Sequence, residues 1–82
     1  MSEHERPPLT LLQWRILALL AGGATDQEIA EVLLTSRSAI QHRLGVIYAL
    51  LSLAGARHPR TAVAVWYLRE GQRWHEEALR DA

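Results

Sequence analysis

The stretch from residue 25 to residue 44 constrains the fold most, because it contains two helix starts close together. Thr25 is followed three residues later by Glu28, which is the signature of a capping box, and Ser36 offers a second N-cap. The pattern predicts a helix-turn-helix, whose second helix has the shape that enters the DNA major groove. After both starts, apolar residues recur at the spacings of three and four that one buried helix face requires: Ile29, Ala30 and Leu33, then Ile40, Leu44 and Ile47.

The segments on either side of this motif also have helical patterns. Thr10 and Gln13 match a capping box at the start of a first helix, and the glycine pair Gly22 and Gly23 is a stop signal. The helix that begins near Ser36 is expected to run from 37 to about 53, because it contains one weak helix former and a plausible end follows at 54–55. The chain is therefore predicted to be all-α.

The C-terminal third predicts a fourth helix and a helical extension. The fourth helix is expected from residue 60 to about residue 69, and Gly71 either ends or bends it. Helix-favouring residues resume after Gly71. We therefore predict a flexible arm over 1–8, a four-helix helix-turn-helix domain over 9–71, and an extended C-terminal helix or tail over 72–82.

Composition limits the class of protein. The 82 residues are enough for one small domain, and the chain contains no cysteine and no apolar run of the roughly 20 residues that a membrane span needs. We expect a cytoplasmic protein that does not enter a membrane. The formal net charge is zero, but no Asp or Glu occurs from Val32 through Arg69, whereas five arginines do. One side of the molecule is therefore expected to be positive, as nucleic-acid binding requires.

The outward face of the predicted second motif helix carries candidate DNA contacts. Gln41 can present its amide to adenine, and His42 can donate a hydrogen bond to guanine. Arg43 suits a phosphate contact, although it could instead pair with Glu31 or with a chain terminus. The full set of phosphate candidates consists of hydroxyls and guanidiniums near the two helix starts: Thr25, Ser36, Arg37, Ser38 and Arg43.

Residues that match one known family are spread over most of the chain, in a fixed order: Leu9-Thr10, Ile16-Leu17, Leu19-Leu20-Ala21, Glu28-Ile29-Ala30, Leu33, Ser36, Ile40, Ile47-Tyr48, Leu51, Arg60-Thr61 and Leu68-Arg69-Glu70-Gly71. In this order they resemble the LuxR-type (GerE-like) DNA-binding domain of bacterial transcription regulators, and the match covers residues 9–71. The resemblance implies a four-helix domain whose third helix reads bases and whose fourth helix often pairs two protomers. It also implies that Gly45 occupies a base-reading position, although relatives commonly have a polar side chain there. Ala39-Ile40-Gln41 replaces the family's usual Thr-Val-Lys, and Leu50 replaces a lysine.

Surplus apolar surface near the C-terminus predicts self-association. One row of residues keeps the spacing of a single helix side before and after Gly71: Ala64, Tyr67, Gly71, Trp74 and Ala78. We expect this row to form the interface of a homodimer. In the alternative arrangement, the aromatic residues of the segment fold back over the core, where aromatic side chains usually lie.

Two functions fit these observations. The first is a small stand-alone transcription regulator that binds double-stranded DNA as a dimer. The second is a helix-turn-helix scaffold whose three tryptophans and neutral charge serve a protein partner, such as another regulator or RNA polymerase. The chain also resembles the fourth region of bacterial sigma factors, and this resemblance suggests a variant of the second function. We expect no enzymatic activity, cofactor or metal site, because the four histidines are dispersed and no phosphate-binding loop is present.

Overall fold

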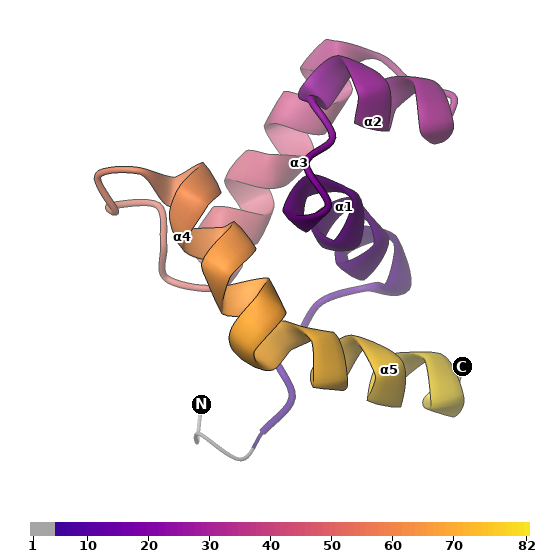
Figure 1. Ribbon diagram of the computed structural model, residues 1–82, viewed down its shortest axis with the longest axis vertical. Coiled ribbons are helices and arrows are strands. Elements are labelled where there is room, and N and C mark those ends of the chain that lie inside the picture. Colours follow the sequence, from indigo (N-terminus) through magenta and orange to yellow (C-terminus); the bar gives the residue numbers. More distant parts are fainter. Residues whose placement is uncertain (1–4) are drawn as a thin grey trace.

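The computed structural model describes residues 5–82, all of whose regular structure is helical (Figure 1). The helices are α1 (Leu11–Ala21), α2 (Asp26–Val32), α3 (Arg37–Leu50), α4 (Pro59–Trp66), the π-helical turn η1 (Tyr67–Gly71) and α5 (Gln72–Asp81). The fold class is the predicted one, a four-helix helix-turn-helix domain with a helical extension at the C-terminus. Within residues 5–82, no helix is both long and apolar enough to span a bilayer.

Local side-chain hydrogen bonds start the first three helices where the sequence predicts. The Thr10 hydroxyl accepts from the N–H of Gln13, and the Gln13 side chain accepts from the N–H of Thr10. Thr25 and Glu28 form the same reciprocal pair at the start of α2. The Ser36 hydroxyl caps α3 by accepting from the N–H of Ala39 at 3.2 Å. These bonds satisfy backbone groups that have no partner within the helix.

The same three helices end in one recurrent arrangement, in which a residue with positive φ follows the C-cap. That residue is Gly23 (φ 100°) after α1, Leu34 (φ 56°) after α2 and Ser52 (φ 59°) after α3. In each case the next N–H donates to a carbonyl five residues earlier, as in the Schellman motif. The end of α3 therefore lies at Leu50, about one turn before the predicted end near residue 53, because Ser52 rather than a glycine supplies the left-handed conformation.

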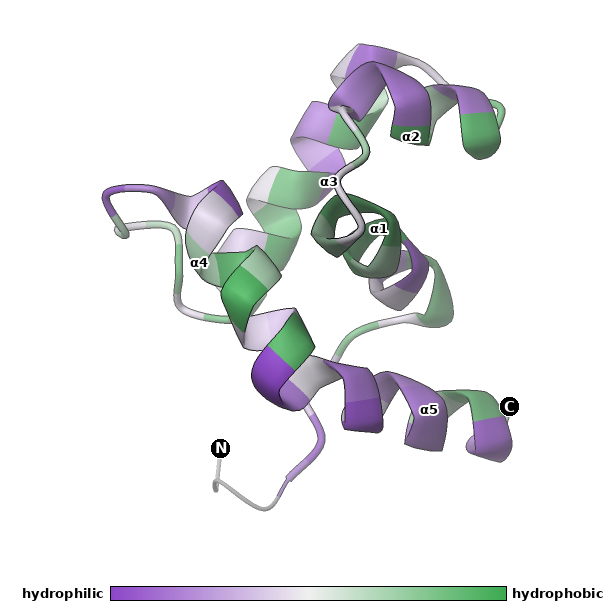
Figure 2. Ribbon diagram, viewed as in Figure 1, coloured by the Kyte–Doolittle hydropathy of each residue, from purple (hydrophilic) through white to green (hydrophobic). Residues whose placement is uncertain are grey.

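The core is centred on α1, which lies between the helix-turn-helix and the C-terminal helices (Figures 1 and 2). In Figure 2, α1 is largely hydrophobic, whereas α5 is largely hydrophilic. The fully buried large side chains come from α1 to α4: Trp14, Ile16, Leu17, Ile29, Ile40, Ile47 and Val63. Leu44 of α3 joins them, so the buried face predicted for the second motif helix is confirmed for Ile40, Leu44 and Ile47.

The chain from Pro59 to Asp81 is one continuous helix with a π-helical turn at Tyr67–Gly71. Gly71 bends this helix and does not end it, so α5 turns away from the direction of α4 and runs beneath α1 (Figure 1). A Cβ at Gly71 would lie 2.7 Å from Cζ3 of Trp66. The bend therefore brings the backbone against the indole ring at a distance that only glycine permits.

The bend assembles an aromatic stack between α1 and the C-terminal helices. The Trp14 ring lies 5.8 Å from the Trp66 ring and 5.8 Å from the His75 ring, measured between centroids, and is nearly parallel to both. The Tyr67 hydroxyl is 2.7 Å from Nδ1 of His75. Burial lowers the pKa of His75 and raises the pKa of Tyr67, because each charged form would lose solvation. The stack thus holds α5 against the core with uncharged aromatic groups.

This arrangement corrects the predicted dimer interface. Tyr67, Gly71 and Ala78 are buried within the monomer, and Ala64 and Trp74 are partly buried against the same core. The row therefore lies on the inner side of the C-terminal helices, as in the alternative in which the aromatic residues fold back. Most of the row is therefore used for packing within the monomer, and of its five residues only Ala64 and Trp74 keep partly exposed surface.

The predicted flexible arm is also held in part. Arg6 forms ion pairs with Glu77 (3.4 Å) and Asp81 (2.7 Å) of α5, and Pro7 is buried. Arg6 and Pro7 are therefore attached to the domain, and the two carboxylates that hold Arg6 come from α5. Residues 1–4 of the predicted arm lie outside the described residues.

Candidate nucleic-acid interface

Helix α3 presents one long side of the molecule to solvent. Its inner side packs against α1 and α2, with Ile40, Leu44 and Ile47 buried. The predicted contact residues of its outer side are all exposed: Arg37, Ser38, Gln41, His42, Arg43 and Gly45. The structure thus brings these six predicted site residues together on the solvent side of one helix.

The two arginines flank the outward face of α3. Since successive helix residues are rotated by about 100°, Ser38, His42 and Ala49 mark the centre of this face. Arg37 and Arg43 lie about 120° to either side of that centre. Within residues 5–82, neither arginine makes an ion pair, so the alternative pairing of Arg43 with Glu31 is absent. As far as residues 5–82 are concerned, both guanidiniums are available to bind anions on either side of the helix.

The three predicted base-reading positions differ in what they offer. His42 is at the centre of the outward face, whereas Gln41 lies toward the flank that carries Arg37. Gly45 adds no functional group. Apart from the neighbouring backbone of α3 itself, no atom would lie within 4 Å of a Cβ built at Gly45, so the fold does not require a glycine there. Its effect is to lower the surface of α3 beside His42.

The hydroxyls of Thr25 and Ser36 already serve as helix caps. Each oxygen accepts a backbone hydrogen bond, so what each can still offer a phosphate is its own O–H. At the start of α2, the carboxylate of Glu28 accepts from the N–H of Thr25, and these capping hydrogen bonds lower the pKa of Glu28. With Asp26 also in this turn, the start of α2 is a weaker anion site than the sequence indicated.

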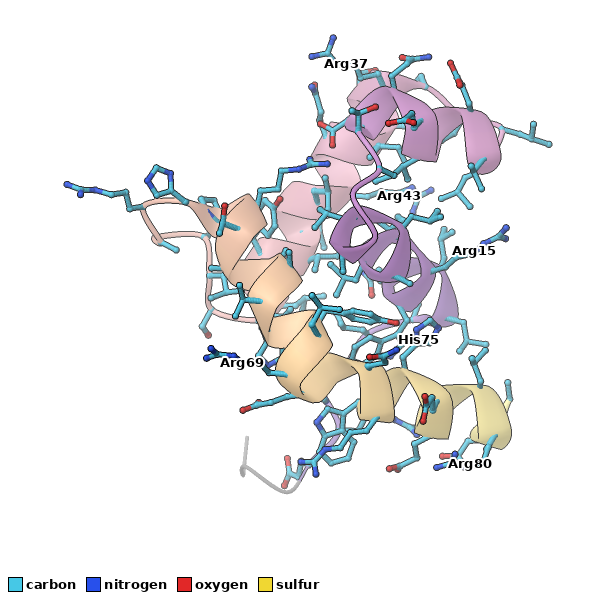
Figure 3. All side chains as sticks on the ribbon, in the orientation of Figure 1. Arg15, Arg37, Arg43, Arg69, His75 and Arg80 are labelled. Atoms are coloured by element: carbon cyan, nitrogen blue, oxygen red, sulfur yellow. The ribbon has the colours of Figure 1, made fainter. Side chains whose placement is uncertain are left out.

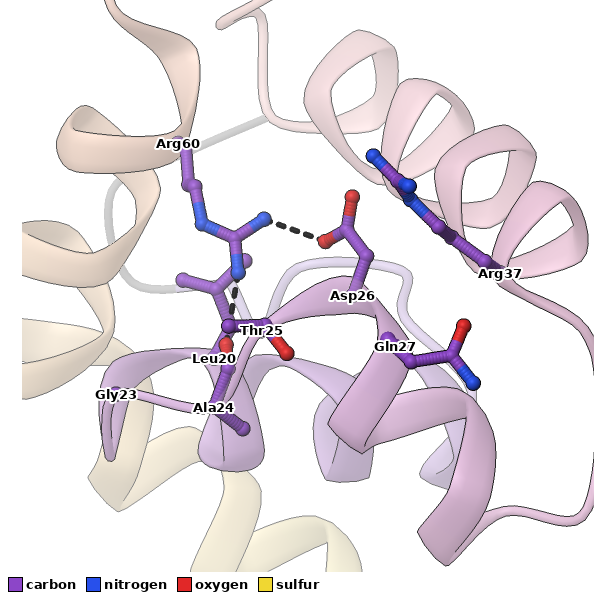
Figure 4. A pocket seen from close by; sticks show the side chains of 8 residues that line it. All are labelled: Leu20, Gly23, Ala24, Thr25, Asp26, Gln27, Arg37 and Arg60. Carbon is purple, nitrogen blue, oxygen red and sulfur yellow. Dashed lines mark hydrogen bonds and ion pairs between the residues drawn. The ribbon is translucent and has the colours of Figure 1, made fainter.

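Arg60 is a residue of this region that the sequence did not single out as a contact. Its guanidinium donates to Asp26 (2.5 Å) and to the carbonyl oxygen of Ala24 (2.8 Å), as Figure 4 shows. The three residues border an open hollow of about 510 Å³ that Arg37 also lines. Arg60 therefore fixes the start of α4 against the start of α2. No sequence spacing signals this pairing, because its partners lie more than thirty residues away.

Charge is unevenly distributed over the molecule. Arg37 and Arg43 belong to the part that contains α2 and α3, whereas Arg69 and Arg80 lie at the opposite end, along η1 and α5 (Figure 3). Helix α3 carries no acidic residue, and every Asp or Glu of the C-terminal helices follows Arg69. The outward face of α3 thus carries an arginine on each flank and no Arg, Lys, Asp or Glu along its centre.

These features define a small all-α domain in which a helix-turn-helix exposes the outer side of its second helix. Comparisons with protein families, curated proteins and solved structures find no match to this chain.

Proposed function

We propose that this chain is a small DNA-binding transcription regulator of the bacterial cytoplasm, which reads the major groove with the outward face of α3. The observation that carries the proposal is the exposed, acid-free face of a helix-turn-helix second helix, with an arginine on each flank that makes no ion pair to any other residue in 5–82. Phosphates border the major groove on both sides, so a cation on each flank suits this mode of docking. The sequence resemblance to LuxR-type domains supports the same conclusion.

Within this proposal, Gln41 and His42 supply the hydrogen bonds to base edges. Gly45 lets the backbone approach the bases, and Arg37 with Arg43 contacts phosphates. A regulator of this class binds a two-fold-related site when it is dimeric. For a second copy we propose the outer side of the helix that runs from Pro59 to Asp81, where Val65 of α4 and Leu68 of η1 are exposed.

The test is a fluorescence-anisotropy titration against a random-sequence duplex pool at low and at moderate salt. The double variant Arg37→Glu/Arg43→Glu should lose binding at both salt concentrations while circular dichroism shows an intact fold. Arg37 is in the first turn of α3, where a glutamate favours the helix dipole, so loss of helix is not the expected cause. The matched control Arg69→Glu/Arg80→Glu makes the same change in net charge at the opposite end and should retain most of the affinity.

Wild-type binding should weaken steeply as salt increases, because phosphate contacts release counterions. If both double variants lost affinity equally, net charge alone would account for the loss. That result would contradict the assignment of α3 as the DNA-binding surface. Absence of wild-type binding at low salt would contradict DNA binding altogether.

The second candidate function is that of a protein-interaction module. Leu34 favours it, because this side chain is 93% exposed in the turn of the helix-turn-helix. An apolar side chain that projects from a turn suits a hydrophobic pocket on another regulator or on RNA polymerase. If DNA binding fails, capture of purified RNA polymerase by the wild type and not by Leu34→Asn would support this candidate.

A further inference from the structure

The part of the outward face beyond His42 has no side chain that can form a hydrogen bond. Gly45, Val46 and Ala49 are all exposed there, and they follow His42 at helical spacings of three, four and seven residues. Val46 is 40% exposed, although its side chain is large and apolar. Half of the proposed reading surface therefore offers only methyl groups and backbone to a partner.

The glycine in this group is not explained by folding. A glycine in the interior of a helix is destabilising relative to alanine, and no atom lies within 4 Å of a Cβ built at Gly45. A close approach of another molecule to the backbone does explain it. Because Val46 is the adjacent residue, the same approach would bring its methyl groups into contact with that molecule.

In the major groove, each base edge presents hydrogen-bonding groups, and thymine alone adds a 5-methyl group. We infer that Val46 contacts thymine 5-methyl groups and makes this chain prefer sites with thymine opposite the C-terminal half of α3. The inference rests on the proposed DNA-binding function. It adds a specificity-determining residue at a position that the sequence did not single out.

The surroundings of Val46 favour DNA over an apolar protein surface as the occupant. Arg37 and Arg43 flank this face, and α3 has no acidic residue that would repel a phosphate. Gln41, four residues before Gly45, can hydrogen-bond to adenine. An adenine contact from Gln41 and a thymine contact from Val46 predict A·T pairs opposite these two residues, in addition to the guanine expected opposite His42.

The experiment compares thymine with deoxyuridine, which differs from thymine only in lacking the 5-methyl group. Duplexes are first selected with the wild-type protein from a random-sequence pool, and each thymine of the selected sequence is then replaced in turn by deoxyuridine. We expect affinity to fall about fourfold at one or two positions, which corresponds to loss of about one buried methyl contact.

The Val46→Ala variant should bind the thymine and the deoxyuridine duplexes equally well. Val32→Ala is the matched control, because Val32 is an exposed valine (50%) at the end of α2, outside the proposed DNA and dimer surfaces, and it should retain the preference for thymine. Selection of a preferred duplex that tolerates deoxyuridine everywhere would overturn the inference and leave the proposed function intact. A preference that persists in Val46→Ala would also overturn it. Failure to select any duplex would instead overturn the proposed function, and the inference with it.

Discussion

The substitution Gly45→Ala is expected to stabilise the protein and to weaken its binding to DNA. An interior helix position gains about 0.8 to 1.0 kcal/mol when alanine replaces glycine. Nothing offsets this gain, because no atom lies within 4 Å of the added Cβ. For a domain of this size, 1 kcal/mol raises the melting temperature by about 4 to 8 °C. Thermal unfolding followed by circular dichroism measures the shift.

The same methyl group should interfere with DNA, because it stands on the proposed reading surface. Inserting a methyl group into a closely packed contact typically costs about 1 to 3 kcal/mol. We therefore expect the dissociation constant for the preferred duplex to rise about tenfold, which corresponds to about 1.4 kcal/mol. A variant that is more stable and binds DNA as tightly as the wild type would refute close approach of the α3 backbone.

Gly71→Ala is the matched control, because it makes the same chemical change in a crowded place. Its Cβ would lie 2.7 Å from the Trp66 ring, and that ring is stacked on Trp14 and cannot move away freely. The overpacking cost exceeds the gain in helix propensity, so we expect a net loss of about 1 kcal/mol. If Gly45→Ala fails to raise the melting temperature, or if both variants shift it in the same direction, the reasoning from local space is wrong.

Three further predictions concern stability. Leu34→Gly should raise the urea midpoint by the equivalent of about 0.5 to 1 kcal/mol, because glycine adopts the left-handed backbone conformation of this position without the strain that a leucine has. The exposed Leu34 side chain makes few contacts that would be lost, and a lower midpoint would contradict this prediction. Burial lowers the pKa of His75 below its ordinary 6.5, so the neutral form is favoured in the fold and the free energy of unfolding should fall as the pH drops from 7 to 5. His75→Gln should flatten this slope in urea titrations at each pH, and an unchanged slope would exclude burial of His75 as its origin. Arg60→Gln should cost at most about 1 kcal/mol in the same assay, because the pair with Asp26 is partly exposed, and a loss of several kcal/mol would show that the pair has a larger role.

Helix starts could be read from the sequence because the interactions that make them are local. Thr10 with Gln13 and Thr25 with Glu28 form their hydrogen bonds across three residues, so spacing alone identifies them. The buried face of α3 was predictable for the same reason, since one helix turn relates Ile40 to Leu44. These two local signals were enough to predict the fold class and the outward position of the candidate DNA contacts.

Helix ends were less predictable. Leu34 and Ser52 adopt the left-handed conformation that the sequence assigns by default to glycine, and packing of the flanking helices compensates for the strain. The predicted end of α3 was too late because it relied on the glycine at position 55 as the stop signal.

The C-terminal third was decided by the tertiary structure. Spacing showed that the row through Tyr67 and Gly71 shares one side of a helix. Spacing within one helix does not specify which other helix covers that side. The bend at Gly71 turns the row toward Trp14 of α1 and places it in the core. The sequence by itself determined what repeats along each helix, because those contacts are a few residues apart; only the folded chain decided which sides meet, because those contacts join residues more than fifty positions apart.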